Sequence, residues 1–61
     1  MRDRLLTMPE VSERTRTPVE TLRYWRARGL GPDSFKVGRR VLYSEAALEA
    51  WLERQMRGES A

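Results

Sequence analysis

Cysteine and histidine are both absent from the 61 residues of this chain. Their absence excludes disulfides, thiol chemistry, zinc sites built on these two residues and acid–base catalysis by histidine. No stretch approaches the ~20 consecutive apolar residues of a transmembrane helix, and no signal peptide precedes the first hydrophobic segment. We therefore expect a cytoplasmic protein with no catalytic activity, metal, cofactor, small-molecule ligand or membrane contact.

The chain is also short, and a domain of this size buries only ~60% of the surface that its unfolded form exposes. Such a small core leaves no room for a deep catalytic pocket. We expect residues 1–61 to form one domain, with an ordered core from about residue 5 to about residue 56.

Lysine is scarce, since the 12 basic residues comprise 11 arginines and one lysine, against nine acidic residues. The charge is unevenly distributed along the chain. Between Arg14 and Tyr43, eight basic residues accompany only two acidic ones, Glu20 and Asp33. A positive middle segment in a nearly neutral chain is typical of a nucleic-acid-binding surface.

The segment Thr17–Gly29 predicts a helix with its own start and stop signals. Thr17 is suited to cap the free backbone N–H groups, and Pro18 to occupy the first helical position. Glu20 completes a capping box with Thr17. Gly29 supplies the left-handed residue with which such helices end.

The helical repeat gives this segment an apolar and a polar side. Leu22 and Trp25 centre the apolar side, which we expect to face the core. The polar side carries Arg23 and Tyr24, with Arg28 at its border. Arginine can bridge guanine O6 and N7 or hold a phosphate, and tyrosine can do the latter. The alternative is an ordinary solvated helix face.

A shorter helix is predicted from residue 8 to about residue 14. Thr7 and Glu10 form a capping box at its start. A helix of about two turns is not stable alone in water, so it must pack on the following helix. Only Thr15 and Arg16 connect the two, and helices joined so tightly are typical of the helix-turn-helix arrangement.

A glycine flanked by aromatic and β-branched residues predicts a β-hairpin over Phe35–Tyr43. We favour a three-residue tip, residues 38–40, because it places Val37 opposite Val41 and brings Phe35, Val37, Val41 and Tyr43 to one core-facing side. A two-residue tip would pair Val37 with Arg40 instead. In either register two arginines lie at the tip, where a phosphate or minor-groove contact is favoured over a role in solubility alone.

Ser44 and Glu45 predict the start of a last helix that runs to about Met56. Its apolar side includes Trp51, which we expect to join Trp25 in the core, with a partner for each indole N–H. The alternative for the two tryptophans is exposed stacking on bases, which we do not favour.

The order helix, tight turn, helix, hairpin, helix resembles the small winged helix-turn-helix domains of the excisionase and MerR-like superfamily. The motifs that carry the resemblance are Leu5–Val11, Thr21–Arg26, Gly29–Pro32, Phe35–Tyr43 and Ala47–Leu52. The glycine-x-glycine-proline run is similar to that of excisionases from actinobacterial phages. The resemblance implies a mainly α fold with a small β-hairpin, in the order α-α-β-β-α. Arg16 departs from the family, which usually has glycine there, so either it adopts a costly left-handed conformation or the turn differs.

Members of this superfamily place the second helix in the major groove and the hairpin, or wing, over the adjacent minor groove. By position, the resemblance implies the DNA-binding residues Pro18, Glu20, Thr21, Arg23, Tyr24, Arg28, Lys36, Arg39 and Arg40. For Arg26, a structural ion pair and a phosphate contact are equally open. Glu20 is favoured as a capping-box carboxylate only, with a cytosine contact as the alternative.

The resemblance further implies an excisionase, a recombination directionality factor that binds DNA cooperatively beside an attachment site. It would bend the DNA and direct a partner integrase toward excision in a bacterial host. Its partners would be double-stranded DNA, the integrase and further copies of itself, arranged head to tail.

Two other functions remain open. One is a small AlpA-like or MerR-like transcriptional regulator on the same fold. A MerR-type sensor is disfavoured because no long dimerisation helix follows before Ala61. The other is a protein-interaction module whose basic face docks on an acidic partner.

Overall fold

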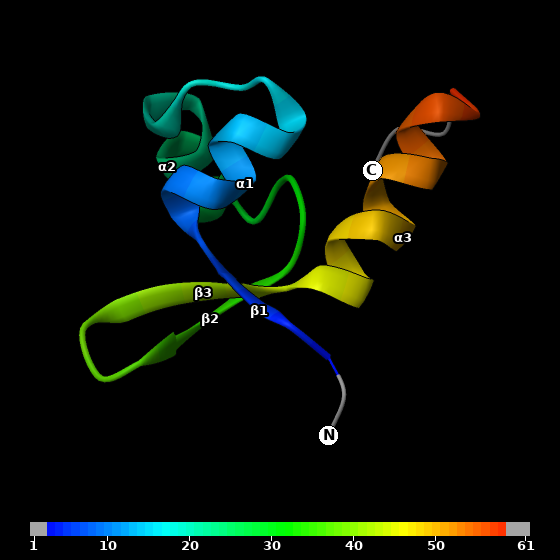
Figure 1. Ribbon diagram of the computed structural model, residues 1–61. Coiled ribbons are helices and arrows are strands. Elements are labelled where there is room, and N and C mark those ends of the chain that lie inside the picture. The colour runs from blue at the N-terminus through cyan, green and yellow to red at the C-terminus, as the bar shows by residue number, and fades with distance from the viewer. Residues whose placement is uncertain (1–2, 59–61) are drawn as a thin grey trace.

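The computed structural model describes residues 3–58. Its elements are β1 (Leu5–Thr7), α1 (Met8–Thr15), α2 (Val19–Arg28), β2 (Ser34–Val37), β3 (Arg40–Ser44) and α3 (Glu45–Met56). In Figure 1, α1 and α2 lie together on one side of a small sheet, the hairpin of β2 and β3 projects beyond them, and α3 stands at the opposite end. The predicted winged helix-turn-helix fold is confirmed, with one strand added.

The added strand is β1, which joins the hairpin in an antiparallel sheet with the strand order β1-β3-β2. It pairs Leu6 with Tyr43, and both side chains are buried. A segment of three residues is too short to show the alternation by which a strand is recognised. The strand leads directly into α1, so it fixes the start of that helix against the sheet.

The capping box of α1 is present as predicted. The Thr7 hydroxyl oxygen accepts from the Glu10 N–H at 3.4 Å, and a Glu10 carboxylate oxygen accepts from the Thr7 N–H at 2.8 Å. The bond from the Thr7 N–H is the main cause that lowers the pKa of Glu10 below its usual value.

The expected capping box of α2 does not form. Pro18 takes the cap position, and no side chain bonds to the free N–H groups there. Thr17 is engaged in the turn instead: its N–H donates to the Ser12 carbonyl at 3.0 Å, and its carbonyl accepts from the Ser12 hydroxyl at 2.5 Å. Thr17 therefore closes the connection between the helices, and Glu20 is not a capping-box carboxylate.

The three-residue hairpin tip favoured from the sequence is wrong. Val37 pairs with Arg40 across a two-residue turn of Gly38 and Arg39, and Lys36 pairs with Val41. In this register Val41 faces the helices together with Tyr43, whereas Phe35 and Val37 lie on the outer face.

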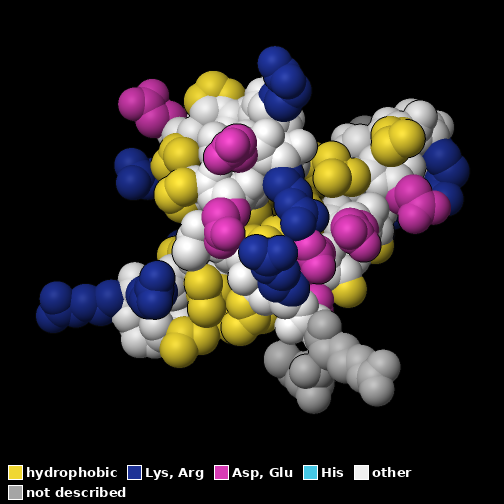
Figure 2. Space-filling view, viewed as in Figure 1, with side chains coloured by type: hydrophobic (Ala, Val, Ile, Leu, Met, Phe, Trp, Pro, Cys, Tyr) yellow, Lys and Arg dark blue, Asp and Glu magenta, His cyan; other side chains and the backbone are white. Residues whose placement is uncertain are grey.

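The outer face of the sheet has no helix over it, and its apolar residues remain exposed. Phe35 is 41% exposed, Val37 53% and Leu5 39%, and Leu42, opposite Phe35, is half-buried. Figure 2 shows hydrophobic side chains gathered over the sheet on the side away from α1 and α2. We call these four residues the outer apolar face.

The core lies between the sheet, α1, α2 and the first part of α3. The buried side chains come from every element except β2: Leu6, Met8, Val11, Leu22, Tyr43, Leu48 and Trp51. α3 begins as predicted, with the Ser44 hydroxyl accepting from the Ala47 N–H at 3.1 Å.

The two tryptophans meet as expected, with ring centroids 5.8 Å apart and the half-buried Trp25 tilted against the buried Trp51. The expectation of a partner for each indole is wrong for Trp51, whose N–H is buried without a hydrogen bond among residues 3–58. Trp25 also contacts the loop that follows α2. A Cβ added to Gly31, which has φ +75°, would lie only 2.8 Å from the Trp25 ring.

Arg16 adopts the left-handed conformation, with φ 52° and ψ 40°, and closes α1. It is the one non-glycine residue with positive φ among the described residues. Of the two alternatives left open for this position, where the family usually has glycine, the left-handed conformation of Arg16 is therefore confirmed.

We expect Arg16→Gly to raise the free energy of unfolding by about 0.5–1 kcal/mol. Glycine removes a left-handed penalty of about 1–2 kcal/mol, part of which is offset by its greater freedom in the unfolded chain. Urea unfolding followed by circular dichroism measures the difference. Arg16→Ala is the control, because it removes the side chain and keeps the penalty. Equal stability of the alanine and glycine variants would contradict a strained turn.

Candidate nucleic-acid interface

The exposed side of α2 is set by what the opposite side buries. Leu22 is fully buried, and Val19 and Trp25 pack partly against the core. Arg23 and Tyr24 are consequently turned to the surface, where Tyr24 is 55% exposed. The assignment of an apolar and a polar side to this helix agrees with the structure.

Arg23 shares an open cleft with the cations of the wing. The cleft has a volume of about 630 Å³ and lies between α2, the hairpin and residues 7–9, where β1 leads into α1. All of its charged lining residues are basic: Arg23, Arg26, Lys36, Arg39 and Arg40. We call this the cationic cleft, and its charge suits the phosphate backbone of a nucleic acid.

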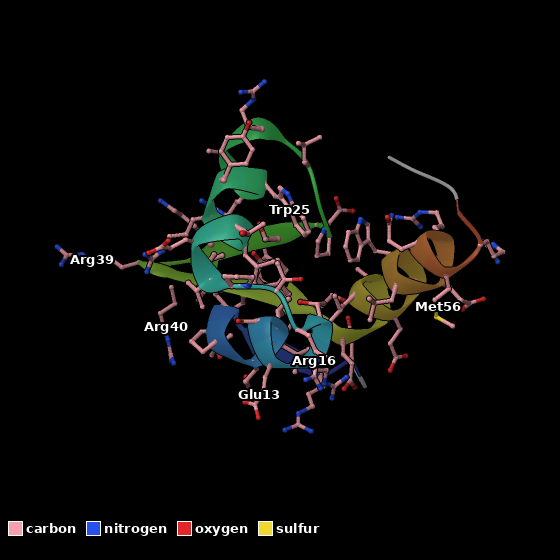
Figure 3. All side chains as sticks on the ribbon, turned by 90° about the horizontal axis from the view of Figure 1, so that it is seen from above. Glu13, Arg16, Trp25, Arg39, Arg40 and Met56 are labelled. Atoms are coloured by element: carbon pink, nitrogen blue, oxygen red, sulfur yellow. The ribbon has the colours of Figure 1, made fainter. Side chains whose placement is uncertain are left out.

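The two arginines near the wing tip point in different directions. In Figure 3, Arg39 extends from the tip away from the body of the protein, whereas Arg40 points to the side on which α1 lies. Arg39 thus extends outward beyond the wing tip, and Arg40 lines the cleft.

Tyr24 and Arg28 form a pair one turn apart on α2. An Arg28 terminal nitrogen donates to the Tyr24 hydroxyl at 3.3 Å, and the guanidinium lies 5.6 Å from the centre of the ring. Stacking on a tyrosine helps to hold an exposed arginine in place. This pair is a second outward-facing group on the same helix as Arg23.

The remaining predicted residues lie at the start of α2. Pro18 borders a separate shallow hollow together with Arg16 and Thr17. Glu20 is exposed in the first turn, and Thr21 is half-buried. The structure thus brings Arg23, Lys36, Arg39 and Arg40 into one cleft, but it places Pro18 in a different hollow.

Arg26 joins the cationic cleft although it was not among the assigned residues. Its Nε donates to the Ser34 hydroxyl at 3.1 Å, and no carboxylate of residues 3–58 forms an ion pair with it. Burial raises the pKa of Tyr43, and the positive charge of Arg26 opposes this shift. Its spacing of three residues from Arg23, which puts both on one helix face, is the signal that could have identified it.

Helix-turn-helix, wing and cationic cleft together define a DNA-binding architecture of the winged helix-turn-helix class. The family described as "Helix-turn-helix domain" matches residues 5–56, and the chain belongs to this family. It is therefore a sequence-specific DNA-binding helix-turn-helix protein. No curated protein and no solved structure matches the chain. Within residues 3–58, none of the helices has the length and apolar character needed to cross a bilayer.

We expect Arg23→Ala to weaken DNA binding by ~1–3 kcal/mol and to relax base preference at one position, as for a bidentate guanine contact. Selection of bound sequences from a random pool, followed by affinity measurements, gives both quantities. Arg54→Ala on α3 is the control for the loss of one positive charge. An equal loss on every sequence would mean that Arg23 holds only phosphate.

Removing Arg39 and Arg40 together should flatten the dependence of DNA affinity on salt. Each phosphate contact contributes about 0.9 to the slope of log affinity against log salt concentration. Fluorescence anisotropy over a salt series measures the slope, and Arg54→Ala with Arg57→Ala is the matched control. A slope as steep as that of the unmodified protein would show that the wing makes no phosphate contact.

Proposed function

We propose that this helix-turn-helix protein is an excisionase that loads cooperatively beside an attachment site, bends the DNA and directs an integrase toward excision. In this function α2 enters the major groove and the wing lies over the adjacent minor groove. The observation that carries the proposal is the cationic cleft, where Arg23 of α2 and the wing cations Lys36, Arg39 and Arg40 share one surface. The sequence resemblance to excisionases supports the same function.

Size favours a protein that acts in several copies. A single module of this kind buries about 600–1,000 Å² on DNA, which gives modest affinity alone. Contacts between copies on neighbouring sites would compensate, and bends in phase with the helical repeat would add up over the array.

The outer apolar face offers a surface for such contacts. Phe35 and Val37 alternate with Lys36 along β2, so they lie on the opposite face of the strand from Lys36, which lines the cationic cleft. Neither residue lines the cleft, and Phe35 lies farther from it than Val37, which pairs with the lining residue Arg40, so a duplex seated there would leave Phe35 free. We assign this face to the next copy on the DNA, because a small exposed cluster of Leu5, Phe35 and Val37 gains most from being covered by protein.

The test is a gel shift with DNA from the attachment region of the mobile genetic element that would encode this excisionase. We expect a ladder of complexes that fills cooperatively, with mobility changes that report a growing bend. Footprinting on the same DNA should show adjacent protected sites. A single stable complex at a promoter would instead support the function as a transcriptional regulator. If the protein showed no salt-sensitive binding to DNA, the protein-interaction module would be the remaining function.

Phe35→Ser should abolish the cooperativity while the affinity for an isolated site stays within about twofold, because the outer apolar face does not contact the duplex. Leu30→Ser is the matched control, since Leu30 is exposed to a similar extent, 43% against 41%, and lies in the loop after α2. Cooperativity that survives in the Phe35 variant would contradict the assignment of this face to a second copy.

A further inference from the structure

The cationic cleft contains one arginine, Arg26, whose exposed side chain is hydrogen-bonded to another element of the fold. Arg26 leaves α2 on the side of the sheet, and its Nε donates to the Ser34 hydroxyl at 3.1 Å. Ser34 is the first residue of β2 and pairs with Tyr43 in the centre of the sheet. The hydrogen bond therefore connects α2 to the base of the wing through the guanidinium itself.

This anchor uses Nε and leaves the two terminal nitrogens of the guanidinium for another ligand. No acidic side chain lines the cationic cleft, and although Arg26 also borders a smaller hollow with Asp33 and Ser34, none of residues 3–58 forms an ion pair with it. By contrast, Arg14 at the surface of α1 is neutralised by Glu45 at 2.6 Å. An arginine that is held by a hydroxyl and lacks an anion is prepared to bind one.

The ligand that fits is a phosphodiester group. A phosphodiester has two non-bridging oxygens, which match the parallel N–H groups of a guanidinium, whereas an ammonium offers only a point charge. Lys36 of the wing lines the same cleft and can supply that point charge from the opposite side. The two residues would hold one phosphate between α2 and the hairpin.

We infer that Arg26, positioned by Ser34, binds the backbone phosphate that separates the groove read by α2 from the groove covered by the wing. This inference rests on the proposed placement of α2 and wing in adjacent grooves. Since a phosphate contact fixes register without reading a base, Arg26 sets the depth at which Arg23 meets the base edges. Ser34 is a positioning residue for this contact and touches no DNA itself.

The experiment compares four variants by fluorescence anisotropy on a mixed-sequence duplex over a salt series. Arg26→Ala should weaken binding about tenfold, as for a hydrogen-bonded charged contact. It should also reduce the salt slope by about 0.9, the value for one phosphate. Arg26→Lys and Ser34→Ala keep the charge, so each should weaken binding severalfold with the slope unchanged. Arg54→Ala on α3 is the control for one lost charge outside the cleft.

If Arg26 served only to stabilise the fold, its replacement would lower the melting temperature of the protein. Arg26 is exposed, and we expect the melting temperatures of all four variants to equal that of the unmodified protein. If Arg26→Ala melts early, the comparison of Arg26→Lys with the unmodified protein still tests the bidentate contact. Nitrogen-15 NMR adds a direct measurement: the terminal nitrogens of Arg26 should shift when the duplex is added, and those of Arg54 should not.

The inference would be overturned if Arg26→Ala matched Arg54→Ala in both affinity and salt slope while the unmodified protein bound DNA. It would also be overturned if the Arg26 resonances did not respond to the duplex. If the unmodified protein itself showed no salt-sensitive binding to DNA, the proposed function would be contradicted, and this inference with it. The two failures are therefore distinguishable.

Discussion

Burial of Leu22 and Trp25 under α2 is the constraint on which the rest of the surface depends. Leu22 is 1% exposed, and complete burial of a leucine contributes about 1.5–3 kcal/mol, a large share for so small a domain. No rotation of α2 about its axis keeps that burial and changes the outward residues. The same contact turns Arg23 toward the wing and places Arg26 against the sheet, so the cationic cleft follows from the packing of the core.

Local chemistry made much of this fold predictable from the sequence. The caps at Thr7 and Ser44 and the end of α2 at Gly29 depend on neighbouring residues only, and the structure has all three. The hairpin register was not predictable in this way. It depends on whether anything covers the outer face of the sheet, and nothing in residues 34–44 reveals that the helices cover only the other face.

The candidate site shows the same division. The outward position of Arg23 follows from the helical repeat, and that of the tip arginines from the glycine turn. The position of Arg26 depends on Ser34, eight residues away across a loop, and no carboxylate of residues 3–58 forms an ion pair with it. Thr17 was misassigned because its hydroxyl donates to the Thr15 carbonyl at 3.1 Å and its backbone bonds to Ser12 in the preceding helix. A local sequence pattern does not reveal hydrogen-bonding partners that only folding brings together.

The close approach of Gly31 to the Trp25 ring has a consequence for the energetics of association. The loop between α2 and β2 cannot swing without separating that contact, so the spacing of reading helix and wing is set before a duplex arrives. Association then loses little conformational entropy in the protein, and the cost of mutual fitting falls on the nucleic acid. If the protein bends DNA as proposed, such a reader would select sites by how readily they deform, in addition to the bases that it touches.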